Sequence, residues 1–145
     1  MSAMTDYLEN KLLDFVLRGQ TFTPPTNVYL ALYTVAPTDA GGGTEVTGGA
    51  YARVAVPCSS TDWAGTQGAA STGASTGSSG TTSNNNTLTF PTPTASWGTI
   101  VAVGLFDATT AGNLLFYGPL AANQVVNTGN TVSFAPGSAS LQIDN

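Results

Sequence analysis

The amino-acid sequence predicts a mainly β fold, an antiparallel β-sandwich of jelly-roll type with one N-terminal α-helix. Short apolar runs bounded by Gly, Pro and Asn recur along the chain, as is typical of strands joined by tight turns. Helical periodicity is confined to one segment near the N-terminus, which disfavours a fold of alternating helices and parallel strands. A length of 145 residues fits a single domain spanning residues 1–145.

The expected helix covers residues 5–18. Leu8, Leu12, Phe15 and Val16 recur there at helical spacing and form one apolar stripe. Because a helix of this length is marginal in water on its own, its stability should come from packing. We expect the stripe to lie across the sandwich or against a neighbouring subunit.

Local signals mark both ends of this helix. Thr5 or Asp6 can cap its first turn, and Gly19 follows its last turn as a stop signal. Asp14 and Arg18 stand four residues apart, a spacing at which side chains of opposite charge meet on a helix surface. The sequence therefore predicts an ion pair between these two residues.

The strongest strand signals are residues 28–34 and 100–106. Both alternating sets of side chains are apolar or aromatic in these segments, as expected for strands that are covered on both faces. Residues 114–117 follow after a polar turn and complete a predicted hairpin with 100–106. Further short strands are expected at residues 51–56, 88–90, 124–126, 131–134 and 141–143.

Residues 59–86 interrupt this pattern as a low-complexity insertion. Within it, residues 64–86 are almost wholly Gly, Ala, Ser, Thr and Asn. Ordering such a stretch costs roughly 1 to 2 kcal/mol per residue in backbone entropy, which the burial of alanine alone does not offset. We expect an exposed, mobile excursion between two strands. An arm that is ordered by a neighbouring subunit is the alternative.

The charge composition excludes several classes of function. Three Lys and Arg residues stand against eight Asp and Glu, so the chain lacks the basic stripe that a nucleic-acid-binding protein needs. The absence of histidine removes the usual neutral-pH base and the commonest zinc ligand. Charged residues make up 8% of the chain, where soluble domains carry about a quarter. A surface of Ser, Thr, Asn and Gly suits a protein that is packed into an assembly.

Cysteine usage and the N-terminal segment add further expectations. Cys58 stands alone and is expected to act as a small apolar residue, without an internal disulfide or a thiolate metal site. Acidic residues interrupt the apolar pattern near the N-terminus, which therefore suits neither a signal peptide nor a membrane span. We expect synthesis in the cytoplasm, no cofactor, no metal and no membrane partner.

Carboxylates are the remaining catalytic groups, and Asp62 and Asp107 form the best candidate pair. A glycosidase would need two carboxylates facing each other across its substrate. Asp107 begins a polar turn directly after a strand, where Asp commonly binds its own backbone. Asp62 stands at the edge of the low-complexity tract. We assign both residues to structural roles and expect no enzymatic activity.

Aromatic residues could form a carbohydrate-binding platform if they shared one exposed face. Trp97 lies between a Pro- and Thr-rich stretch and a strand, where an aromatic residue often closes the end of a sandwich. Packing in the core is therefore the preferred interpretation for this group. The four residues concerned are Tyr51, Trp63, Trp97 and Tyr117.

Motifs along most of the chain form a common set. They are 6–10 (DYLEN), 17–19 (LRG), 26–34 (TNVYLALYT), 37–39 (PTD), 49–53 (GAYAR), 90–91 (FP), 95–99 (ASWGT), 104–107 (GLFD) and 112–118 (GNLLFYG). Together these segments resemble a group of small virion proteins of tailed phages, and the resemblance covers nearly the whole chain except residues 59–86. It implies a virion component without an enzymatic site. Members of the group are often labelled tail-fibre proteins, and proteins of this size and build are also similar to jelly-roll cement proteins of phage heads.

Between the two locations, the compact build favours a capsid cement or decoration protein on the surface of the phage head. A receptor-binding fibre normally needs an elongated trimeric shaft and an N-terminal anchor, whereas a cement subunit needs a small rigid body. The expected partners are the major capsid protein and further copies of the chain, as a dimer or trimer. The alternative is a small tail-fibre or baseplate-associated protein that contacts the host. The residues expected at interfaces are Leu8, Leu12, Phe15, Val16, Arg53 and Trp97.

Overall fold

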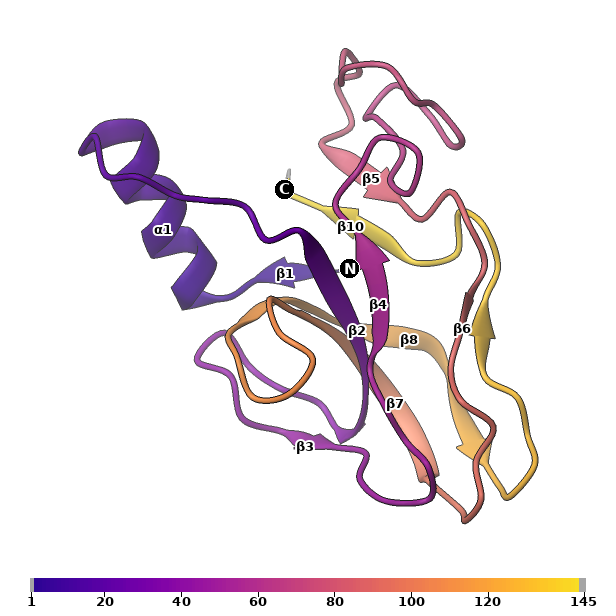
Figure 1. Ribbon diagram of the computed structural model, residues 1–145. Helices are drawn as coiled ribbons and strands as arrows, with labels where there is room; N and C mark the ends of the chain where they lie inside the picture. The colour runs from indigo at the N-terminus through magenta and orange to yellow at the C-terminus, as the bar shows by residue number, and fades with distance from the viewer. Residues whose placement is uncertain (1, 144–145) are drawn as a thin grey trace.

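The computed structural model describes residues 2–143 and confirms a mainly β fold with an N-terminal helix (Figure 1). Most strands belong to one antiparallel sheet, and the helix projects from one side of the body. The elements are β1 (Ala3–Met4), α1 (Asp6–Leu17), β2 (Asn27–Val35), β3 (Thr44–Glu45), β4 (Val54–Pro57), β5 (Thr81–Ser83), β6 (Leu88–Thr89), β7 (Gly98–Phe106), β8 (Leu114–Val126), β9 (Ser133–Phe134) and β10 (Ser140–Gln142).

The main sheet has six strands in the order β1-β8-β7-β2-β3, with β4 paired to β2 on the same side as β3. All of these pairs are antiparallel. The prediction that residues 28–34 form a central strand is confirmed, because β2 has β7 on one side and β3 and β4 on the other. Both alternating sets of its side chains are covered, which explains why both sets are apolar or aromatic.

The two faces of the main sheet carry two separate apolar clusters. Leu30 and Leu32 of β2 point to the face that is covered by two short ribbons, β6–β9 and β5–β10. Ala31 and Tyr33 point to the opposite face, together with Phe106 of β7. The ribbons form the second layer of the sandwich in place of a second full sheet. The larger cluster therefore lies between the main sheet and these ribbons.

The predicted hairpin is confirmed as β7 and β8, which pair Gly104 with Tyr117. The expectation of a separate strand at residues 124–126 is wrong, because β8 continues without a break to Val126. The register jumps by several residues of β8 between the pairs Ile100↔Gln124 and Ala102↔Pro119, so residues 120–123 bulge out of the ladder. Such bulges bend a strand while keeping it in the sheet.

Some strand boundaries also differ from the sequence expectation. β4 begins at Val54, so that residues 51–53 precede it, and β6 ends at Thr89. Tyr51 instead turns its hydroxyl into the core, where it accepts a hydrogen bond of 2.9 Å from the backbone N–H of Leu32. The short strands β1 and β5 were not anticipated. Both pair with strands that are more than fifty residues distant in sequence.

The low-complexity tract is partly built into the second layer, contrary to the expectation that it is exposed throughout. β5 pairs with β10, and Ala64 N–H donates to the carbonyl of Ser83. Asn84 is 1% exposed and Ala64 is 6% exposed. Backbone pairing and amide hydrogen bonds anchor these residues, which compensates for the lack of large apolar side chains. The excursion proper is therefore limited to residues 65–80, above β5 in Figure 1.

Deleting residues 67–79 and joining Thr66 to Gly80 through a two-residue Asn-Gly turn should leave the fold intact. The ends of this segment are close, because Ser79 Oγ donates to the carbonyl of Thr66 at 2.9 Å. We expect a midpoint of thermal unfolding within a few degrees of the parent, measured by circular dichroism, because closing a shorter loop changes the entropy little. Deleting residues 65–84 instead removes β5 and Asn84, and this variant should fail to fold. Equal stability of the two deletions would contradict the anchoring of residues 81–84.

Candidate functional site

We call Thr5 and Asp6, where α1 begins, the root of the helix. Thr5 is the N-cap residue, is 2% exposed and fixes the root to the body. Its hydroxyl donates to the carbonyl of Leu114 in β8 in place of capping the helix. Its backbone N–H donates to the carbonyl of Leu115 at 3.1 Å. The N–H of Asp6 donates to the carbonyl of Asp39 at 3.1 Å. These bonds at the edge of the sheet set the direction in which the helix leaves the body.

A second contact supports the same root. The hydroxyl of Tyr117 donates to Asp39, and this hydrogen bond raises the pKa of Tyr117 to about 12. The predicted helix is confirmed to within one residue at each end, and Asp14 and Arg18 form the predicted ion pair at 3.0 Å. Gly19 follows with a φ of +65°, as a helix stop requires. The helix is thus well formed and firmly rooted.

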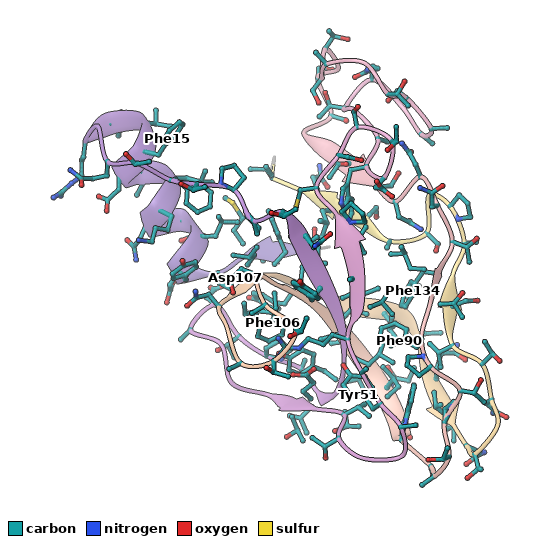
Figure 2. The ribbon with its side chains drawn as sticks, viewed as in Figure 1. Phe15, Tyr51, Phe90, Phe106, Asp107 and Phe134 are labelled. Atoms are coloured by element: carbon teal, nitrogen blue, oxygen red, sulfur yellow. The ribbon has the colours of Figure 1, made fainter. Side chains whose placement is uncertain are left out.

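The far end of α1 projects away from the body, and we call residues 13–17 the tip. Leu8 is the one buried residue of the helix, whereas Phe15 is 53% and Val16 70% exposed. Figure 2 shows Phe15 on the projecting helix, well apart from the aromatic side chains of the sandwich. The expectation that the stripe lies across the sandwich is therefore wrong for Phe15 and Val16, because the root directs the helix off the sheet edge. Leu8 packs against the body, and Leu12 is half-buried. Packing of the stripe on a neighbouring subunit stays a prediction.

Replacing Leu8 by Asp should destabilise the monomer by several kcal/mol, because it places an unpaired charge where the helix meets β8. Val16→Asp is the matched control on the same helix, and it should leave the free energy of unfolding of the monomer within about 0.5 kcal/mol of the parent. Urea unfolding followed by tryptophan fluorescence measures both. A large loss in the Val16 variant at low protein concentration would mean that the tip packs on its own body.

An open apolar groove runs between β8 and the second layer. It consists of two adjoining cavities, with volumes of about 330 and about 530 Å³. Both cavities are lined by Leu120, Ala121, Phe134 and Ser138. Ser2 lines the first cavity, and its hydroxyl accepts a hydrogen bond of 2.9 Å from the N–H of Gln142. Half-buried apolar side chains form the walls, among them Trp63, Val103, Phe116, Leu120, Phe134 and Leu141.

Arg53, expected at an interface, lies inside the body with 7% of its side chain exposed. Its guanidinium binds both carboxylate oxygens of Glu45, at 2.8 and 2.7 Å, and also the carbonyls of Ala108 and Ala111, each at 2.8 Å. It stacks 3.4 Å above the ring centre of Phe106. Burial alone would lower the pKa of Arg53, yet the bonds to Glu45 hold this pKa above its ordinary value. Arg53 thus joins the loop after β7 to β3.

Trp97, also expected at an interface, is 4% exposed and closes one end of the larger apolar cluster. Its indole N–H donates to the carbonyl of Gly49 at 3.0 Å, and its ring meets that of Tyr51 edge to face at 5.3 Å. Phe90 completes this aromatic group (Figure 2). Burial raises the pKa of Tyr51, whose hydroxyl donates to Glu45. Of the six expected interface residues, those on α1 beyond its first turn are the accessible ones.

The two carboxylates considered for catalysis each accept hydrogen bonds from polar groups beside them. Asp107 accepts hydrogen bonds of 2.7 Å from the backbone N–H and from the side-chain amide of Asn113, and so stabilises the turn that the sequence indicated. Asp62 accepts from Ser59 and from Asn86, which lies 24 residues further along the chain. The bond from Ser59 holds the pKa of Asp62 below its ordinary value.

Residues 2–143 contain no group of three or more His, Cys, Asp and Glu side chains arranged to hold a metal ion. Over the same range, no helix is long and apolar enough to cross a membrane. The helix tip and the apolar groove are the features of residues 2–143 that we consider for contact with another molecule.

Comparison with known families shows the class of protein to which the chain belongs, the structural proteins of tailed phages. The model of one family, Gp80, described as podophage GP4 fiber I protein gp80, matches residues 3–142. The chain therefore belongs to this family, which indicates a location in the virion. No curated protein matches the chain.

Proposed function

We propose that this protein is a small fibre- or tail-associated structural subunit of the phage virion. The observation that carries the proposal is the family match over residues 3–142, whose description names a fiber protein. That description supports the tail-fibre alternative better than the capsid cement protein that the compact build favoured. The role we propose is mechanical, with no reaction catalysed.

The geometry of α1 also supports this proposal. A helix of 12 residues is about 18 Å long, and α1 extends away from the body from a root that four hydrogen bonds hold in place. An apolar tip on a rigid helix is a suitable attachment device, because a preorganised contact loses little conformational entropy on binding.

Copy number and position in purified virions test the proposal. Quantitative mass spectrometry should find the protein at a small fraction of the copy number of the major capsid protein, and immunogold labelling should place it at the tail. As a control, labelling of the major capsid protein should decorate the head in the same particles. A copy number comparable with that of the capsid protein, with label over the whole head, would overturn the fibre proposal in favour of capsid cement.

A further inference from the structure

We propose that copies of this chain assemble head to tail, with the apolar tip of α1 from one copy inserted into the groove beside β8 of the next. Two unpartnered apolar features, a projection and a hollow, occur on the same chain. This contact does not depend on whether the protein sits on the head or the tail of the virion. The occupant of the groove is a second copy of the chain.

The tip is shaped for insertion into a groove. Four of the seven large hydrophobic residues that are strongly exposed within residues 2–143 are in this segment: Leu13, Phe15, Val16 and Leu17. Successive helix residues point about 100° apart, so the last three of these side chains point to different sides of the helix. A helix end that is apolar on several sides is covered best by walls on several sides. Side-by-side pairing of two such helices would leave a portion of the tip in water.

The groove offers such walls. The lining of its first cavity is mainly apolar, and the lining of the second is mixed, with Gln124, Asn130, Thr131 and Ser133 beside the apolar side chains. Among the described residues that line its two cavities, none is charged. The tip carries one charged residue, Asp14, which forms an ion pair of 3.0 Å with Arg18, just beyond the tip. The cavity volumes of about 330 and 530 Å³ are in the range that accommodates several buried side chains. The tip can therefore enter without leaving a buried charge unpaired, because its carboxylate already has Arg18 as a partner.

The tip and the groove of one copy are held apart. Thr5 and Asp6 fix the root of α1 at the outer edge of the main sheet, and the helix runs away from β9 and β10 (Figure 1). The contact must therefore join two different copies. Because it uses a different surface on each copy, it is heterologous, and repetition gives either a closed ring or an open chain.

The test uses two variants of the whole chain, each with one surface blocked. Phe15→Glu places a charge on the exposed tip, and Ala121→Glu places a charge at the exposed rim shared by both cavities of the groove. Val35→Glu, at an exposed apolar site outside both surfaces, is the control. Light scattering should give multiples of the 14.6 kDa monomer mass for the parent and for the control. Each blocked variant alone should be monomeric, with self-association weakened by at least about tenfold.

A mixture of the two variants tests whether the tip of one copy contacts the groove of another. The intact tip of the Ala121 variant can enter the intact groove of the Phe15 variant, so the mixture should form a one-to-one dimer of limited size. Circular dichroism melts of each variant confirm that the fold is retained. If the Ala121 variant alone still assembles like the parent, the tips pair with each other and the proposal is wrong. A parent that stays monomeric at its solubility limit would also overturn it, and would assign the tip to a different virion protein.

Discussion

Arg53→Ala is expected to lower the free energy of unfolding by about 3 to 5 kcal/mol, because it breaks a buried ion pair. The substitution leaves the carboxylate of Glu45 partly buried without its partner, and it strips the carbonyls of Ala108 and Ala111 of their donor. It also removes the cation from the face of Phe106. Urea unfolding followed by tryptophan fluorescence measures the loss.

Two further variants separate charge from geometry at this site. Arg53→Lys keeps the charge but cannot reproduce the fork that binds two carboxylate oxygens and two carbonyls, so its loss should be intermediate. Combining Arg53→Met with Glu45→Gln removes both charges, and the double variant should lose less than the sum of the single variants. An Arg53→Ala protein within about 1 kcal/mol of the parent would show that this pair is not a structural clamp.

Asn84→Ala should destabilise the protein by about 2 to 4 kcal/mol, because several buried groups lose their partners at once. The side-chain amide of Asn84 donates to the carbonyls of Asn86 and Ala135, at 2.8 and 2.9 Å, and its oxygen accepts from the N–H of Ala139 at 2.9 Å. The residue thereby joins the end of the low-complexity tract to the segment between β9 and β10. Thermal unfolding by circular dichroism is the measurement.

The neighbouring residue provides a matched control. Asn85 has the same side chain, but its amide nitrogen makes long hydrogen bonds of 3.4 and 3.5 Å, and its amide oxygen is buried without a partner. Asn85→Ala should therefore change stability by less than about 1 kcal/mol. If the two alanine variants were equally stable, the bonding of Asn84 would not be what anchors β5.

The elements of the fold that could be predicted are those with a strong local pattern. β2 and β7 are apolar in both alternating sets, which is sufficient to identify central strands, and α1 combines periodicity with signals at both ends. β5 has the sequence Thr-Thr-Ser, and its existence depends on pairing with β10, a contact that no local pattern reveals. In β8, Gly118 and Pro119 resemble a turn, so the sequence pattern predicts two strands where one long bulged strand exists.

The candidate site, too, could be predicted from the sequence only in part. Periodicity identifies the apolar stripe of α1, but it does not tell whether the same chain covers that stripe, because the direction of the helix depends on hydrogen bonds from Thr5 to β8. Arg53 looks like a surface cation in the sequence. The carbonyls that it binds, those of Ala108 and Ala111, come from a loop 55 and 58 residues away, and no local pattern reveals this contact. The groove has no sequence signal, because it is the space left where a second full sheet would be.

The bonds at the root of α1 also constrain the order of events during synthesis. Thr5 leaves the ribosome well before its partners Leu114 and Leu115, which follow it by 109 and 110 residues of chain. Closing so long a loop before β7 and β8 have paired is entropically unfavourable, so the helix should acquire its fixed direction late. A nascent chain would then not yet present its tip in the orientation that the proposed head-to-tail assembly uses. Subunits that have finished folding would be favoured for incorporation, and half-made chains on one polysome would be kept from joining prematurely.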